Sequence, residues 1–422
     1  MFFENPCESS ITARFYRALS LEAVTSSETR DLIYSTAANM VAEAERFSMR
    51  GDLWELFFAI DVILDDNPVC RVYERRPVQG DIFRVLAYDL WRMYRRVKAV
   101  KEMVAADERF EPLRIMRDFS PRNGTVCLQQ KHSHDDVSLL ATQFSAASSP
   151  DEMAAALGTF CEKRGAGKFA LEAAFTWDSG SKSLVPIDDT DPQTLSSLVG
   201  YESQKAELLA NTESFIRGNP SNNALLFGDS GTGKSSSARA LLNEPDFVER
   251  GLRMIELRHD QFGDIPDILR KIRERNYRFI LFMDDLSFEE FEVGYKHLKA
   301  LIEGGLERKP DNAIIYATSN RRKIIREVWQ DRAATSDDVH GWDTMQEKQS
   351  LADRFGLAIW YPSASKDEYL SIVRAIAEEM GLAIPDSEME TLAMRWELGR
   401  GFTGRSARQF VYHMLQQKVR QL

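Results

Sequence analysis

Apolar positions in the first 165 residues recur at three- and four-residue steps, which is typical of helices that bury one face. One apolar stripe runs along residues 80–106 and consists of Ile82, Phe83, Leu86, Leu90, Met93 and Val97. A capping box at residues 149–152, with proline at the first helical position, opens another helix that ends near Gly165. We therefore expect residues 1–165 to form a mainly α-helical N-terminal domain.

The pattern changes over residues 166–197. The runs Lys168–Trp177 and Ser183–Ile187 flank the polar residues 178–181, which predicts a hairpin. The stretch 188–192 is polar and contains a proline, as a linker would. We therefore place a hairpin and linker, and with them a domain boundary, in residues 166–197.

Short apolar runs alternate with helix-compatible segments over residues 198–361. The predicted strands are Leu225–Phe227, Arg253–Leu257, Phe279–Met283, Ala313–Thr318 and Ala358–Tyr361. Such alternation indicates an α/β fold with a parallel sheet flanked by helices on both faces.

Helical spacing returns in residues 362–422. A second capping box, Ser365–Glu368, begins a helix that directs Tyr369, Val373, Ile376 and Met380 inward. Two further helices are predicted, over residues 387–399 and from about Arg405 onward. We expect these helices to form a small C-terminal lid.

A glycine-rich loop follows the first of the predicted parallel strands, and a helix follows the loop. Residues 228–235 match the phosphate-loop pattern G-x-x-x-x-G-K-[ST]. Its glycines allow backbone N–H groups to surround an anion, and the helix N-terminus adds positive potential. Lys234 would reach the β/γ-phosphates, and the Ser235 hydroxyl would bind Mg²⁺. The expected nucleotide contacts at this loop are Gly228, Asp229, Ser230, Gly231, Thr232, Gly233, Lys234, Ser235 and Ser236.

Two carboxylates end the predicted strand Phe279–Met283. Asp284 would hold Mg²⁺ through water and accept a hydrogen bond from Ser235, whereas Asp285 would orient or deprotonate the attacking water. The alternative is an acid pair at the surface of the sheet.

Asn320 follows the predicted strand Ala313–Thr318. Its amide could polarise the attacking water and sense the γ-phosphate, or it could simply cap the next helix.

Two arginines complete the candidate site. Arg354 precedes the last predicted strand and would reach a neighbouring subunit's γ-phosphate as an arginine finger, or else pair with an acid such as Asp353. Arg405, at the start of the last lid helix, could contact the nucleotide, with Arg408 as its rival. Either of these two could instead be a solvated charge.

Together these motifs make residues 198–422 resemble the AAA+ family of ATPases. The segments 198–205, 284–289, 317–322 and 353–356 look like one bacterial AAA+ family that is catalogued only as a domain of unknown function. The resemblance implies that Val199, Gly200 and Tyr201 border the adenine. It also implies Walker A at Lys234 and Ser235, Walker B at Asp284 and Asp285, sensor 1 at Asn320, the finger at Arg354 and sensor 2 at Arg405. It brings no substrate with it.

Composition narrows the possible partners. The formal net charge of −11 argues against wholesale coating of nucleic acid or anionic membrane, although a local basic patch, such as residues 270–275, could still contact phosphates. No apolar run approaches the length of a membrane span, and residues 1–6 do not resemble a signal peptide. The four scattered cysteines suit free thiols in a reducing cytoplasm.

These patterns favour an ATPase that uses ATP and Mg²⁺. It would form a homo-oligomeric ring through Arg354, and its hydrolysis cycle would move the lid and the N-terminal region against an unidentified protein or nucleic-acid client. One alternative is a nucleotide-gated binding module with little or no turnover. Another is a DNA-linked loader or initiator ATPase.

Overall fold

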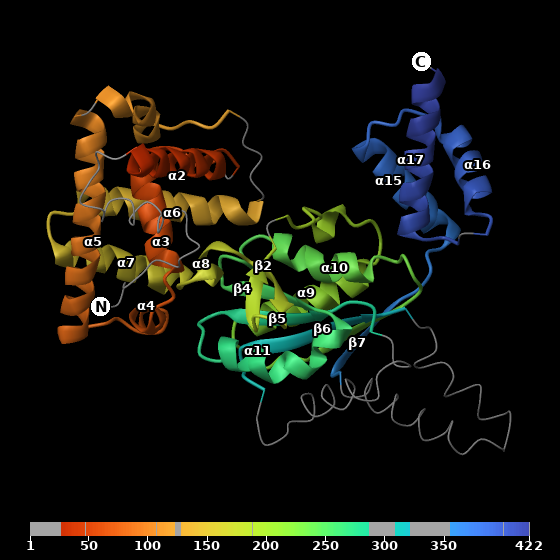
Figure 1. Cartoon of the computed structure of the whole chain (residues 1–422). Coiled ribbons are helices and arrows are strands. Elements are labelled where there is room, and N and C mark those ends of the chain that lie inside the picture. Colours follow the sequence, from red (N-terminus) through yellow and green to blue (C-terminus); the bar gives the residue numbers. More distant parts are fainter. Residues whose placement is uncertain are drawn as a thin grey trace. The chain divides into compact units, whose positions relative to one another are not determined.

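The computed structural model describes residues 27–46, 48–106, 108–122, 128–187, 189–286, 309–320, 355–399 and 401–421 (Figure 1). The chain forms two compact units. The first comprises residues 1–173, 188–190 and 275–277, and the second comprises residues 174–187, 191–274 and 278–422. Arg354 and the rest of residues 321–354 lie outside the described residues.

The described part of the first unit is built from helices. Its elements are α2 (Ser27–Arg46), α3 (Leu53–Leu64), α4 (Pro68–Tyr73), α5 (Asp81–Ala106), the 3₁₀ helix η1 (Glu108–Arg117), α6 (Leu128–Ala146), α7 (Pro150–Arg164) and α8 (Lys168–Leu171). Side chains cap the N-termini of three of these helices: Asp52 accepts hydrogen bonds from the backbone of α3, Asn67 from that of α4 and Ser149 from that of α7. These caps fix where each helix starts and so which face it buries.

The apolar stripe of α5 packs into the core of this unit. Leu86, Leu90, Met93 and Val97 are buried as predicted, whereas Ile82 is 54% exposed. Ile82 lies at the edge of the stripe in the first turn, so the prediction that it packs inward was wrong.

The second unit contains a seven-stranded sheet in the order β2-β1-β4-β5-β6-β3-β7. Its strands are β1 (Ala174–Asp178), β2 (Ser183–Pro186), β3 (Ala224–Gly228), β4 (Leu252–Leu257), β5 (Arg278–Met283), β6 (Ala313–Ser319) and β7 (Leu357–Tyr361). Strand β2 pairs antiparallel with β1, and the other pairs are parallel. The predicted α/β fold is therefore confirmed.

The hairpin β1–β2 is part of this sheet, because β1 pairs with β4. The predicted first strand, Lys168–Trp177, is only half right. Its first residues form the short helix α8, in which Phe169 and Ala170 are buried, and the strand starts at Ala174. A short buried run has no period that separates helix from strand, which explains the error.

Helices cover both faces of the sheet. The elements between the strands are η2 (Leu195–Ser197), α9 (Glu202–Ile216), α10 (Lys234–Ala240), η3 (Leu241–Asn243), η4 (His259–Asp264) and α11 (Ile265–Ile272). The connections from β3 to β4 and from β4 to β5 run in opposite directions across the sheet. Right-handed crossovers therefore place α10 and α11 on opposite faces, as Figure 1 shows.

The predicted lid consists of α15 (Lys366–Glu379), α16 (Asp386–Glu397) and α17 (Gly404–Gln421). These helices share an apolar core that includes Tyr369, Val373 and Phe410. Met380, predicted to point inward, is 36% exposed, because α15 ends one residue earlier at Glu379.

Candidate nucleotide-binding site

The glycine-rich loop joins β3 to the N-terminus of α10. All residues of β3 are buried between β6 and β7, so the strand sets the position of the loop. Gly228 has φ of 141°, and a Cβ atom there would lie 2.0 Å from the carbonyl oxygen of Tyr361 in β7. Only glycine allows the chain to leave the strand at this point.

Lys234 is folded back onto this loop. Its Nζ donates to the carbonyl oxygens of Gly228, at 3.1 Å, and Asp229, at 2.5 Å. The side chain is buried, and this desolvation lowers the pKa of Lys234 to about 8. Negative charge from phosphate groups would stabilise the ammonium form and draw the amine from these carbonyls.

Asp284 lies at the end of β5, next to the start of α10. Its Oδ1 accepts hydrogen bonds from the hydroxyl of Ser235, at 2.5 Å, and from that of Thr318, at 2.7 Å. Because β6 lies between β3 and β5, Thr318 at the end of β6 fills the space between the loop and Asp284. The predicted neighbours Ser235 and Asp284 are thus brought together, and Thr318 is a positioning residue that the sequence reasoning missed.

Asp285 adopts the left-handed backbone conformation, with φ of 54°. Such a conformation is uncommon for a residue with a side chain and is found where surrounding contacts hold it. Here the backbone N–H of Asp285 donates to Thr318 Oγ1 at 2.9 Å, and Asn320 Nδ2 donates to Asp285 Oδ1 at 2.5 Å. The structure therefore brings together the two polar side chains, Asp285 and Asn320, that were predicted to handle the attacking water.

Arg239 also reaches Asp284, which the sequence reasoning did not anticipate. Its Nη2 lies 2.9 Å from Asp284 Oδ2 and 2.9 Å from Glu256 Oε1, and its guanidinium lies over the Phe282 ring at 5.3 Å. Arg239 is one helical turn after Ser235, so both side chains project from the same face of α10. The four-residue spacing of Ser235 and Arg239 in the predicted helix is the feature of the sequence that could have predicted this contact.

The predicted adenine-side segment precedes α9. Gly200 and Tyr201 both have positive φ, of 83° and 60°. The Tyr201 hydroxyl donates to the carbonyl oxygen of Pro362 at 2.8 Å, and its ring lies 5.1 Å from that of Tyr361. The buried Lys205 amine donates to the carbonyl oxygen of Leu198 at 2.7 Å. These contacts hold residues 198–201 in place beside the end of β7.

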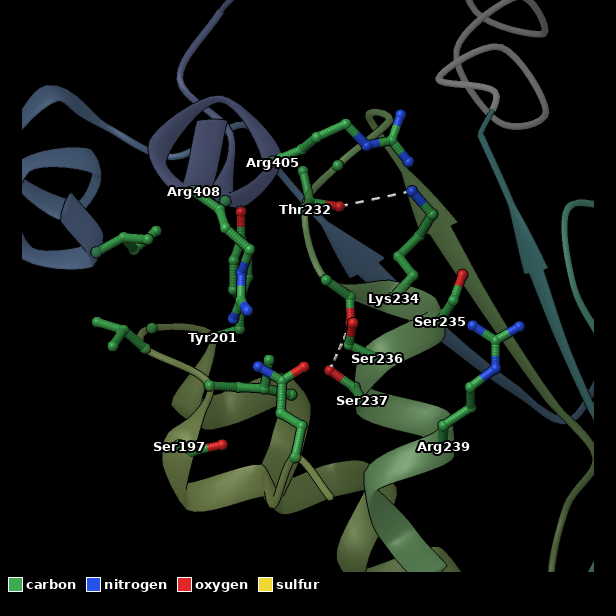
Figure 2. A pocket seen from close by; sticks show the side chains of 18 of the residues that line it. Ser197, Tyr201, Thr232, Lys234, Ser235, Ser236, Ser237, Arg239, Arg405 and Arg408 are labelled. Atoms are coloured by element: carbon green, nitrogen blue, oxygen red, sulfur yellow. Dashed lines mark hydrogen bonds between the residues drawn. The ribbon is translucent and has the colours of Figure 1, made fainter. Parts of the chain in front are cut away.

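The lid reaches the phosphate loop through the first turn of α17. The backbone N–H of Arg405 lies 3.4 Å from the carbonyl oxygen of Gly231, and its Nη1 lies 3.4 Å from Ser230 Oγ. Arg408 projects from the same helix into the same pocket (Figure 2). Both arginines can therefore approach a phosphate group bound in the pocket.

A pocket of about 820 Å³ lies between the loop, the 198–201 segment and the lid helices. Of the predicted contacts, it is lined by Val199, Gly200, Tyr201, Gly231, Thr232, Gly233, Lys234, Ser235, Ser236, Asp284, Asp285, Asn320 and Arg405. Gly228, Asp229 and Ser230 lie on the loop but do not line it. The pocket is of the size that small-molecule sites have.

The donor set also fits ATP with Mg²⁺. Lys234, Arg405 and Arg408 supply positive charge at the pocket, and Ser235 and Asp284 supply the oxygen ligands that Mg²⁺ takes alongside water and phosphate. A Cβ atom at Gly231 would lie 3.1 Å from the Cβ of Arg405, so the loop and lid already meet closely.

A family model matches residues 170–418, which is more than half of the chain. Its description is "Protein of unknown function (DUF815)". The match confirms the resemblance to a family of unknown function that the motifs predicted. No curated protein matches the chain significantly.

Solved structures similar to the chain include the RuvB Holliday junction branch migration motor of Thermotoga maritima, at 20% identity and a TM-score of 0.37. The alignment covers 52% of this chain and 63% of that chain. A point variant of the same protein has 21% identity, a TM-score of 0.38 and the same coverage. The chain thus spans just under two-thirds of the length of these proteins. In the described part of the chain, no helix combines the length and hydropathy that crossing a bilayer requires.

Proposed function

The chain belongs to the protein family described as "Protein of unknown function (DUF815)", and we propose that it is an AAA+ ATPase that binds ATP with Mg²⁺ and hydrolyses it. The observation that carries this proposal is the convergence of Lys234, Ser235 and Asp284 at one pocket, joined by the 2.5 Å hydrogen bond between the last two. Two separate parts of the fold supply these groups: α10 begins with Lys234 and Ser235, and Asp284 directly follows β5.

The residues divide the chemistry among them. Lys234 and the loop amides bind the phosphates, and Ser235 with Asp284 binds Mg²⁺, which neutralises charge on the transferring phosphoryl group when bound. Asp285 and Asn320, held together by a hydrogen bond, orient the attacking water, and Asp285 accepts its proton. Arg405 or Arg408 senses the γ-phosphate from the lid.

A neighbouring subunit supplies Arg354 in this proposal, so that hydrolysis requires a homo-oligomeric ring. The cycle then moves the lid and the helical first unit against a client. The Cys70 and Cys161 thiols are free, as a reducing compartment such as the cytoplasm keeps them.

Continuing phosphate release, measured after correction for the first turnover, tests hydrolysis. We expect sustained release from wild-type protein and its loss in Asp285→Asn, with ATP binding retained. An Asp285→Asn variant that turns over as fast as wild type would remove the proposed role of Asp285. Arg354→Ala should abolish turnover in concentrated samples. Full activity of this variant would contradict the proposal that Arg354 acts as an arginine finger on a neighbouring subunit's nucleotide.

A nucleotide-gated binding module is the second candidate. The ion pair between Arg239 and Asp284 favours it, because the arginine competes with Mg²⁺ for the proposed metal ligand. Stable bound ATP without phosphate release by the wild-type oligomer would support this candidate and exclude sustained hydrolysis.

A further inference from the structure

One face of helix α5 carries arginines that have no acidic partner among the described residues. Arg92, Arg95 and Arg96 are exposed, and no ion pair or hydrogen bond of theirs occurs in the described part of the chain. Arg84 precedes these arginines on the helix, and its Nη1 lies 3.7 Å from Asp81 Oδ1, which is a long distance for an ion pair.

The exposed residues follow a helical repeat. Six exposed residues share one side of the helix, because they are spaced to recur with its turns: Val85, Tyr88, Arg92, Arg95, Arg96 and Ala99. We call this set the α5 stripe. At the rise of an α-helix it is about 21 Å long. No acidic residue of α5 lies within the stripe, because Asp81 and Glu102 lie near the helix ends and Asp89 is buried.

An aromatic side chain belongs to the stripe. Tyr88 is 66% exposed and lies one turn before Arg92, and Val85 beside it is 37% exposed. An exposed aromatic ring next to unpaired arginines is the combination that binds single-stranded nucleic acid, because bases stack on the ring and phosphates pair with the guanidinium groups.

We propose that the α5 stripe binds single-stranded nucleic acid. The charge complementarity of three unpaired arginines with a phosphate backbone argues for this partner, and Tyr88 gives a base a surface to stack on. The opposite side of α5 packs against α3, α7 and η1, so the stripe is the side of this helix that a ligand can reach. The proposal is independent of ATP hydrolysis, because the stripe lies in the first unit.

The test measures binding of a fluorescent oligothymidylate of about 20 nucleotides to the full chain by anisotropy, over a series of salt concentrations. The key variant is Arg92→Gln/Arg95→Gln/Arg96→Gln. Its matched control is Arg71→Gln/Arg114→Gln/Lys163→Gln, which removes the same charge from the same unit. Each control residue has a partner: Arg71 and Lys163 pair with Asp66 and Asp136, and Arg114 donates to the carbonyl oxygen of Ala105 at 3.3 Å.

We expect wild type and the control to bind with a steep salt dependence. The stripe variant should bind at least about tenfold more weakly at low salt, and the slope of log K against log salt should be smaller by about 2, or about 0.7 per lost phosphate contact. Tyr88→Ala should weaken binding by about 5- to 150-fold, the equivalent of a stacked base at ~1–3 kcal/mol, with little change in slope.

Four results would overturn the proposal: no binding by wild type at low salt, wild-type binding by the stripe variant, equal losses in both triple variants, or binding only to vesicles containing phosphatidylserine. The last would identify the stripe as a membrane contact. Melting curves check folding. Should the triple variant unfold, Arg92→Gln alone must reduce the slope by about 0.7 for the proposal to stand.

Discussion

Arg239 and Asp284 form an ion pair in which Nη2 of the arginine lies 2.9 Å from Oδ2 of the carboxylate. The other oxygen of Asp284 faces Ser235 and Thr318, so one carboxylate is shared between the P-loop helix and the end of β6. The proposed metal ligand is therefore oriented by three neighbours, and Arg239, which it shares with Glu256, offsets part of its charge.

Removing the charge of Arg239 should strengthen Mg²⁺ binding. In Arg239→Gln the carboxylates of Asp284 and Glu256 lose their shared cation, which leaves the site more negative. The pair is partly exposed, so we expect a modest gain. The Mg²⁺ concentration for half-maximal ATP binding should fall about 1.4- to fivefold, in line with ~0.2–1 kcal/mol for such pairs.

A Mg²⁺ titration at fixed ATP measures this change, with Arg239→Lys as the control that keeps the charge. A higher Mg²⁺ requirement in Arg239→Gln would contradict it and would show that the arginine mainly orients Asp284.

Thr318→Val should destabilise the chain and slow turnover. The buried hydroxyl donates to Asp284 and accepts from the backbone of Asp285, and valine of nearly the same shape offers neither contact. We expect a loss of about 1–3 kcal/mol in the free energy of unfolding. Denaturant titration and kcat measure the two effects. Thr318→Ser should retain most of both, and unchanged stability in Thr318→Val would exclude the bridging role.

ATP binding should weaken as the pH rises above about 8. The folded chain's Lys234 has a pKa lowered by burial to about 8, below its usual value of 10.5. The proposed complex requires the ammonium form, so above that pH the free chain must take up a proton on binding. The affinity should then fall, approaching tenfold for each pH unit.

Calorimetry in two buffers of different ionisation enthalpy measures this proton uptake directly. Proton uptake near zero at about pH 9, together with a Kd that is constant from about pH 7.5 to about pH 9.5, would contradict a depressed Lys234 pKa.

For the chain without nucleotide, the same lowered pKa of Lys234 affects the free energy of unfolding. The unfolded state binds more protons between pH 8 and 10.5, so this contribution to stability rises with pH across that window.

Gly228→Ala should disrupt the loop. The new methyl group would lie 2.0 Å from the Tyr361 carbonyl oxygen, and φ of 141° is strained for any residue but glycine. We expect at least about 1–3 kcal/mol of destabilisation from strain alone, and loss of ATP binding. Gly263→Ala is the matched control, because no atom lies within 4 Å of its Cβ position and its φ is not positive. A Gly228→Ala chain as stable as this control would show that the loop can relax.

Much of the sheet could be predicted from the sequence because its strands are short buried runs flanked by turn residues. The predictions for β3, β4, β5, β6 and β7 match the structure to within a residue at each end. The phosphate loop could also be predicted, because phosphate binding requires glycines and a lysine such as Lys234 at a fixed spacing.

Contacts between distant segments could not be predicted in the same way. Arg275 was included in the basic patch of residues 270–275, but it is buried and pairs with Glu74 at 2.5 Å and Asp66 at 2.7 Å, which are far away in sequence. Thr318 likewise gains its role only because β6 lies between β3 and β5. A single sequence shows which side chains are polar but not which of them meet.

Calorimetric titration of the purified chain with ATP in excess Mg²⁺ tests the central claim most directly, with Lys234→Ala as the control and a melting curve on each sample. We predict saturable binding, a rise in melting temperature that grows with ATP concentration, and loss of both in Lys234→Ala. Absence of binding heat and of any thermal shift at saturating nucleotide in a folded wild-type sample would contradict the account.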